Sequence, residues 1–298
     1  MSPVFSIITP CFNSSATLLS TYESLLRQAC ADFDWILVDD ASTDNGQTKT
    51  LINKLQRESP FNVKTIFLEN NYFGSRSVFA GCGIAEGKYI AILDHDDQLT
   101  PDALQYVNNH LDKYGNVKEI AGVCGRCVDE SGQLIGEKFH SDCFLANEAE
   151  VRFEMGITSE LFQFTRVEVA MPFFALMEPG YTNGFVWAKI AQKHNYIYVN
   201  DVLRIYDTVL PTSYSNTKSM TIRYPDNKAK ALKETLICYR PHLRRNILYS
   251  LQLIGSYVRH TINAKQKYIS IFKGFDIKIK FLVFLLYPIS YAKAKGFF

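Results

Sequence analysis

Five carboxylates follow two apolar segments that have the pattern of buried strands. They are Asp39 and Asp40 after residues 35–38, and Asp94, Asp96 and Asp97 after residues 89–93. Because parallel strands deliver their carboxyl ends to one edge of a sheet, these side chains are expected to lie near one another. Carboxylates held close together repel, and a divalent cation relieves that repulsion. The sequence therefore predicts a metal site, with Mg²⁺ or Mn²⁺ as the cation.

The second group contains an Asp-x-Asp triplet, which suits a metal ion that also binds a diphosphate. Hard oxygen ligands hold the ion, and its remaining positions take diphosphate oxygens and water. A leaving diphosphate gains charge that the ion neutralises, which is Lewis-acid catalysis. A dinucleotide-binding dehydrogenase is disfavoured, because Pro10-Cys11-Phe12-Asn13 follows the first strand where a glycine-rich motif would be needed.

The elements around these carboxylates alternate between strand and helix patterns. Strands are expected at residues 5–9, 35–38, 63–68 and 89–93, and helices at residues 14–28, 51–55, 75–85 and after Thr100. This alternation predicts an α/β fold with a Rossmann-like, mainly parallel sheet flanked by helices. Residues 120–135 break it, because they have the pattern of a strand, a turn and a second strand.

Three stretches of the chain resemble family 2 glycosyltransferases of the GT-A fold, in matching order and spacing. They are FSIITPCFNSSATLLSTYESLLRQ, FDWILVDDASTD and NNYFGSRSVFAGCGIAEGKYIAILDHDDQLTPDAL. The resemblance is close over residues 4–107 and loose over residues 108–210. It implies inverting, metal-dependent transfer of a hexosyl or N-acetylhexosaminyl group from a nucleoside diphosphate sugar, expected to be UDP-linked. The acceptor it implies is a glycan or a lipid-linked molecule in bacterial surface polysaccharide biosynthesis.

The resemblance also assigns residues to the nucleotide sugar, namely Thr9, Pro10, Phe12, Asp39, Asp40, Arg76 and Asp94. Phe12 replaces a more usual Tyr and would form a wall for the base, unless it is a core residue. Asp39 would accept a hydrogen bond from the base, with Asp40 beside it. Arg76 would face the nucleotide or the diphosphate, with a surface ion pair as the alternative.

The same resemblance distributes roles within the acidic triplet. Asp96 is expected to be the main metal ligand, and Asp94 to contact the ribose or the metal. His95 occupies the variable position and is expected to be a spectator. Asp97 is expected to cap a helix or to support the metal ligands.

Inversion at the anomeric carbon needs a base that deprotonates the acceptor hydroxyl on the face opposite the leaving group. Family 2 enzymes usually carry an acidic residue ahead of a helix here, but Asn183 stands at the aligned position and cannot act as a base. Glu178 is the nearest substitute, unless it is only an exposed loop residue. Asn183 also keeps open an alternative function, that of a catalytically silent nucleotide-sugar-binding protein at the membrane periphery.

Charge is distributed unevenly along the chain. Residues 1–217 contain 16 Lys and Arg against 27 Asp and Glu, a balance of −11, whereas residues 218–298 contain 16 against 3, a balance of +13. We therefore expect a GT-A catalytic domain at residues 1–217, with a nucleotide-sugar-binding half at 1–107 and an acceptor half at 108–217. A basic helical extension follows at residues 218–298.

The extension contains the apolar run 281–287, with lysines close on both sides. It is far shorter than the roughly 20 residues that span a bilayer, and it suits an interfacial position better. We expect a membrane-peripheral protein at the inner face of the cell membrane, with a helical cap on the catalytic domain as the alternative. Binding of nucleic acid is disfavoured, because no pattern of stacked aromatics in a basic groove accompanies the charge.

The seven cysteines are odd in number and irregularly spaced, which favours buried thiols in a reducing compartment. The first residues have neither a basic region nor a long apolar region of the kind found in secretory signals. Both observations favour a cytoplasmic protein.

Overall fold

The computed structural model describes residues 4–114, 117–207 and 223–295, and the chain divides into two compact units. The sheet unit comprises Met1–Ala146, Ser159–Met177 and Lys193–Leu210, and the helical unit comprises Asn147–Thr158, Glu178–Gln192 and Pro211–Phe298. Two short segments of the expected catalytic domain thus join the C-terminal helices. The boundary expected at residue 217 lies outside the described residues.

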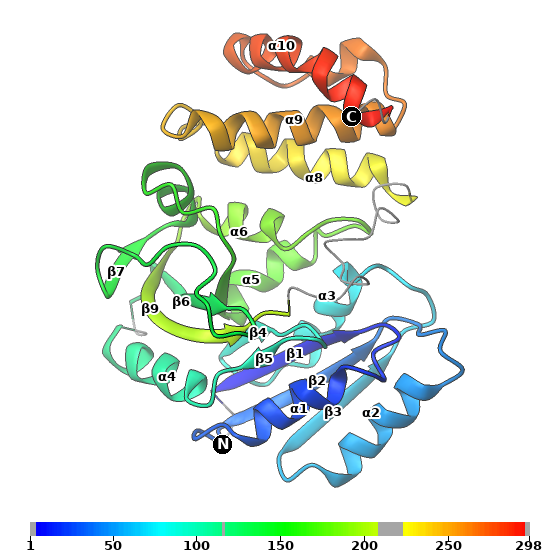
Figure 1. The fold of residues 1–298 in the computed structure, drawn as a ribbon, viewed down its shortest axis with the longest axis vertical. Coiled ribbons are helices and arrows are strands. Elements are labelled where there is room, and N and C mark those ends of the chain that lie inside the picture. Colours follow the sequence, from blue (N-terminus) through cyan, green and yellow to red (C-terminus); the bar gives the residue numbers. More distant parts are fainter. Residues whose placement is uncertain (1–3, 115–116, 208–222, 296–298) are drawn as a thin grey trace. The chain divides into compact units, whose positions relative to one another are not determined.

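The sheet unit is built on a nine-stranded sheet with the order β3-β2-β1-β4-β8-β6-β9-β5, in which β7 also pairs with β9. The strands are β1 Phe5–Cys11, β2 Phe33–Asp39, β3 Asn62–Phe67, β4 Tyr89–Ile92, β5 Gln98–Leu99, β6 Ile120–Val128, β7 Cys143–Ala146, β8 Leu161–Arg166 and β9 Asn195–Ile205. The neighbours β3, β2, β1 and β4 are parallel, as is the β6–β9 pair, whereas β8 is antiparallel to both β4 and β6. The expected α/β class is confirmed, with its parallel character strongest in the first four strands (Figure 1).

Helices cover both faces of this sheet, because alternate strand residues point to opposite sides. The helices are α1 Leu18–Leu26, α2 Gln47–Glu58, α3 Ser75–Ile84, α4 Ala103–Tyr114 and α5 Val167–Phe174. Ile7 and Trp35 belong to the core that contains the apolar residues of α1, α2 and α4. Ile8 and Val38 face α3, where a Cβ at Gly81 would lie 2.6 Å from Cγ2 of Ile8. The absence of a side chain at Gly81 lets α3 pack closely on the sheet.

The second strand expected after the turn within residues 120–135 is absent, and this prediction was wrong. The turn forms, with the Gly132 amide donating to the Asp129 carbonyl at 2.9 Å, but the returning chain makes only the bridge between Val128 and Leu134. The reason is that β6 already pairs with β8 on one side and β9 on the other, so it has no free edge for a third strand. The apolar runs at residues 196–199 and 202–206 belong mainly to the continuous strand β9.

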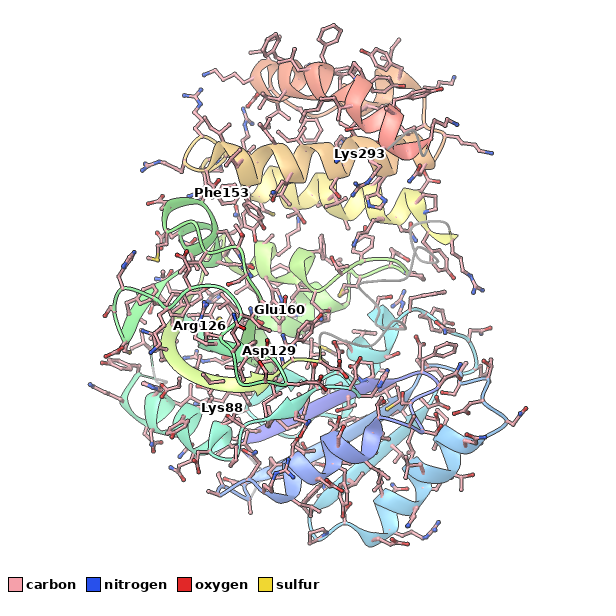
Figure 2. The ribbon with its side chains drawn as sticks, viewed as in Figure 1. Lys88, Arg126, Asp129, Phe153, Glu160 and Lys293 are labelled. Carbon is pink, nitrogen blue, oxygen red and sulfur yellow. The ribbon has the colours of Figure 1, made fainter. Side chains whose placement is uncertain are left out.

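The helical unit contains α6 Gly184–Ile190, α8 Pro225–Cys238, α9 Ile247–Asn263 and α10 Ile277–Ala294, with a π-helical turn at Glu150–Glu154 and a 3-10 turn at Tyr268–Phe272. Figure 1 shows α10 lying on α9, and α9 on α8. Their buried faces share one apolar core with the ring of Phe153, which is labelled in Figure 2. This ring lies 5.2 Å from the Tyr239 ring. Within the described residues, no helix combines the length and the apolar character that crossing a membrane requires.

Candidate active site

The ends of three adjacent parallel strands bring the predicted carboxylates to one edge of the sheet. β1 lies between β2 and β4, and the backbone pairing continues past the strands: the Asp40 amide donates to the Cys11 carbonyl at 2.8 Å and the Leu93 amide to the Ile8 carbonyl at 2.9 Å. Burial raises the pKa of the Cys11 thiol, and the charges of Asp39 and Asp94 raise it further. Negative charge from both neighbouring strand ends therefore acts at the end of β1.

The loops at this edge hold strained backbone conformations. Among the described residues, five non-glycine residues have positive φ, and four of them lie in these loops: Asn13, Ala41, Asn45 and Phe73. The loop after β1 is tied to the loop after β2, because Asn13 accepts a hydrogen bond from the Thr43 amide at 2.7 Å. Strain of this kind persists where the surrounding structure fixes it, and it concentrates at functional sites.

Asp39 and Asp40 are adjacent in sequence but have different surroundings. One carboxylate oxygen of Asp39 accepts hydrogen bonds from the amide and hydroxyl of Ser42, and the described residues give its second oxygen no partner. Both oxygens of Asp40 accept backbone hydrogen bonds at 2.9 Å, from the Tyr72 and Gly74 amides. Asp39 can therefore accept a further hydrogen bond, whereas Asp40 fixes the loop that precedes α3.

The carboxylates of residues 94–97 also differ in whether a protein group already binds them. Asp97 is 1% exposed, and the Arg204 guanidinium on β9 donates to it at 3.1 Å. Arg204 also donates to Glu160, just before β8, at 2.9 Å and lies over the rings of two aromatic residues, Phe162 and Tyr206. Asp97 thus ties the loop after β4 to β9, and its expected support of the metal ligands stays a prediction. Our sequence analysis did not single out Arg204, although a lone arginine in an apolar strand was a usable signal.

The carboxylates of Asp94 and Asp96 remain available to a ligand. Asp94 is exposed and Asp96 half-buried, and the described part of the chain gives neither carboxylate a hydrogen bond or an ion pair. Protein atoms crowd around the Asp94 carboxyl although solvent reaches the residue, and this desolvation raises its pKa. The charge of Asp96 raises the pKa further. A divalent cation would relieve this repulsion, so the two side chains fit the expected metal.

Two carboxylates are enough only if other ligands complete the coordination. Within the described residues, no group of three or more His, Cys, Asp and Glu side chains could hold a metal ion. His95 is engaged elsewhere, because its Nδ1 lies 2.8 Å from the Thr17 hydroxyl. A divalent ion held by Asp94 and Asp96 would therefore need diphosphate oxygens and water as its remaining ligands.

The other residues assigned to the nucleotide sugar lie near this edge with unequal access. Thr9 is fully buried, and its hydroxyl accepts a hydrogen bond from the Trp35 indole at 2.8 Å, so its side chain is already used inside the sheet unit. Phe12 is 39% exposed and Pro10 half-buried. Arg76 lies in the first turn of α3, where its guanidinium is 5.8 Å from the Phe79 ring centroid. No ion pair holds Arg76 in the described structure.

The two residues considered for the catalytic base belong to the helical unit. Glu178 is half-buried, and its carbonyl accepts a hydrogen bond from the Tyr181 amide at 3.0 Å. Asn183 precedes α6 as its N-cap residue, but its side chain makes no capping hydrogen bond. Asn183 therefore occupies the position ahead of a helix at which the family resemblance implied an acid. The roles of both side chains remain predictions.

Comparison with known proteins agrees with this architecture. The model of the family described as "Glycosyl transferase family 2" matches residues 6–169, which is more than half of the chain. The chain therefore belongs to glycosyl transferase family 2, a family of glycosyltransferases. The matched region contains both acidic groups and the loops that hold them.

A curated relative and two solved structures are similar to the chain. The amylovoran biosynthesis glycosyltransferase AmsB of Erwinia amylovora is 31% identical over 34% of this chain and 33% of its own length. S. aureus TarS (residues 1–349) in complex with UDP-GlcNAc aligns with a TM-score of 0.61 and 14% identity, over 98% of this chain and 92% of that one. The mannosyltransferase PcManGT of Pyrobaculum calidifontis, in complex with GDP-Man and Mn²⁺, aligns with a TM-score of 0.56 and 15% identity, over 98% and 81%. The two structures establish the GT-A fold. The chain spans a third or less of the length of the first three curated relatives.

Proposed function

We propose that this protein transfers a sugar from a nucleoside diphosphate donor, UDP-linked, to a glycan or lipid-linked acceptor in surface polysaccharide biosynthesis. The observation that carries the proposal is a set of three carboxylates at the ends of β2 and β4, the two strands that flank β1. Asp39 has one unpartnered oxygen, and Asp94 and Asp96 have no hydrogen bond or ion pair in the described structure. Asp39 would accept a hydrogen bond from the base. The nucleotide-sugar complexes of the two structural neighbours support a donor of this chemistry.

We propose Mg²⁺ or Mn²⁺ as the cofactor, held by Asp96 and Asp94. When bound, the ion would neutralise charge on the departing diphosphate. Arg204 supports this role indirectly, because its ion pair with Asp97 holds the loop that presents both ligands. The Mn²⁺ in the PcManGT complex supports use of a divalent metal.

We propose Glu178 as the base that activates the acceptor. It would take the proton from the acceptor hydroxyl as that oxygen bonds to the anomeric carbon and the bond to the diphosphate breaks, which inverts the anomeric configuration. Asn183 cannot take a proton in this way and would serve only to bind or orient the acceptor. The alternative function, nucleotide-sugar binding without transfer, is motivated by Asn183.

We further propose that the protein is cytoplasmic and attaches to the inner face of the cell membrane through its basic helices, without nucleic acid as a partner. The positive balance of residues 218–298 and the exposed apolar side chains of α10 support this attachment. Basic residues near an anionic leaflet contribute about 1 kcal/mol each. Sedimentation of the full chain with anionic but not neutral vesicles, reversed by salt, is the expected result. A chain that stayed in the supernatant at low salt would contradict the attachment.

Release of UDP from a panel of UDP-sugars, with and without Mn²⁺ and a glycan acceptor, tests the transfer reaction. Because water can take the place of the acceptor hydroxyl, metal-dependent UDP release from one sugar is the expected minimum. Saturable UDP-sugar binding with no release or transfer under any of these conditions would favour the silent alternative. Failure of all the sugars to bind would contradict both functions.

A further inference from the structure

The helical unit contains an open apolar pocket whose edge is positively charged. It has a volume of about 820 Å³ and lies between α9, α10 and the 3-10 turn before α10. Its apolar walls include Leu243, Ile247, Leu251, Phe272, Phe281 and Leu282. A volume of this size is within the range of pockets that hold small molecules.

Three cations line the same pocket, namely Arg244, Lys278 and Lys280. In the described structure, no ion pair or side-chain hydrogen bond engages their charged groups. The nearest carboxylate in the sequence, Asp276, is already used, because it pairs with Arg240 at 2.8 Å and caps the first turn of α10. The pocket therefore combines an apolar interior with uncompensated positive charge.

The outer face of α10 extends this apolar surface. On the inner face, Ile279 and Val283 are buried against α9. On the outer face, Ile277 is 78% exposed and Phe281 60% exposed, and further large apolar side chains follow at Phe284, Leu285 and Ile289. A helix that is apolar on both faces needs a second apolar environment beyond its own core.

We propose that this pocket binds an acyl chain of an anionic phospholipid from the membrane surface, with the lipid phosphate held by Arg244, Lys278 and Lys280. The occupant follows from the chemistry, since a ligand that satisfies both the apolar walls and the three cations must be apolar at one end and anionic at the other. A second copy of the chain fits less well, because a two-fold contact would bring like charges on the two pocket edges together. This inference specifies the membrane attachment proposed above and rests on it.

The test uses the full chain and dioctanoyl phosphatidylglycerol below its critical micelle concentration, so that single lipid molecules are offered. Isothermal titration calorimetry should detect saturable binding near one lipid per chain, weaker with the phosphatidylcholine of the same chain length and weaker in high salt. Leu251→Trp, which fills the pocket, should abolish binding. Arg244→Glu combined with Lys278→Glu, both exposed positions, should weaken it by at least about tenfold.

Lys293→Glu combined with Lys295→Glu is the matched control, because it makes the same charge change at the other end of the sequence of α10, away from the pocket lining. This variant should keep the wild-type affinity for the monomeric lipid. Equal loss in both double variants, or unchanged binding in Leu251→Trp, would overturn the pocket. Vesicle binding without any binding of monomeric lipid would also overturn the pocket but would leave surface attachment intact. A dimer in sedimentation velocity that phosphatidylglycerol does not dissociate would overturn the pocket as well.

The glycosyl transfer reaction is assayed separately in the same variants. Release of UDP from a soluble donor without lipid should be unchanged in all of them, because the substituted residues belong to the helical unit and the proposed donor residues to the sheet unit. Lipid binding by a protein that releases no UDP would contradict only the proposed transfer. UDP release by a protein that binds no monomeric lipid would contradict only the pocket.

Discussion

Replacing Arg204 should destabilise the sheet unit strongly, because it leaves the buried carboxylate of Asp97 without its cation. The side chains of Arg204 and Asp97 are 5% and 1% exposed and 3.1 Å apart, so neither is compensated by water. Removing one partner of such a buried pair costs about 3–5 kcal/mol of the free energy of unfolding. Arg204→Met keeps much of the packing between the rings of Phe162 and Tyr206 while deleting the charge.

The measurement is urea denaturation followed by fluorescence in a Trp187→Phe background, so that Trp35 reports on the sheet unit alone. Glu160→Gln is the control, since the Glu160 side chain is 50% exposed and its pair with Arg204 should be worth only about 0–1 kcal/mol. Burial raises the pKa of Asp97 and Arg204 opposes that shift, so without Arg204 the carboxyl should take up a proton more readily. The difference between Arg204→Met and the wild type should therefore be smaller at pH 5 than at pH 7. A loss below 1 kcal/mol at pH 7 would refute the supporting role of this ion pair.

Three further predictions concern the donor site and the base. Asp40→Asn should destabilise the protein by about 1–3 kcal/mol, measured in the same denaturation assay, because a carboxylate that accepts two backbone hydrogen bonds is replaced by a group with one acceptor. Because the pKa of Asp94 is raised, protons should compete with Mn²⁺ for this carboxylate at a higher pH than for an ordinary aspartate. The Mn²⁺-dependent affinity for UDP, measured by titration calorimetry as pH is lowered, should therefore begin to fall above the usual pKa range of aspartate. A fall only near pH 4 would contradict this. Glu178→Gln should lower turnover by about two to four orders of magnitude with donor affinity nearly unchanged, and unchanged turnover would remove Glu178 from the role.

Much of the sheet and the location of the donor site could be predicted from local patterns. Apolar segments such as residues 35–38 form strands because alternate side chains enter the cores on the two faces, and a carboxylate directly after such a strand must lie at its end. The fold class and the gathering of acidic groups at one edge follow from those two facts.

Local patterns could not predict which carboxylate is free to bind a ligand and which one supports the loop. Asp96 and Asp97 are adjacent in sequence but have different roles. Asp97 is paired with Arg204, on a strand more than a hundred residues later, whereas Asp96 has no such partner and can bind a ligand. The missing strand after β6 has the same origin, because its edge is taken by β9, which comes much later in the chain. Local sequence does not contain this information, since it depends on which strands become neighbours.

The affinity for UDP, measured by titration calorimetry with and without Mn²⁺, tests the proposed donor site most directly. The wild type should bind UDP substantially more tightly with Mn²⁺, and Asp96→Ala should lose that difference, because it deletes a carboxylate that would hold the ion. Asp102→Ala, which removes an exposed carboxylate just before α4, should behave as the wild type. If UDP affinity in Asp96→Ala responded to Mn²⁺ as strongly as in the wild type, the metal-assisted donor site at this edge of the sheet would be contradicted.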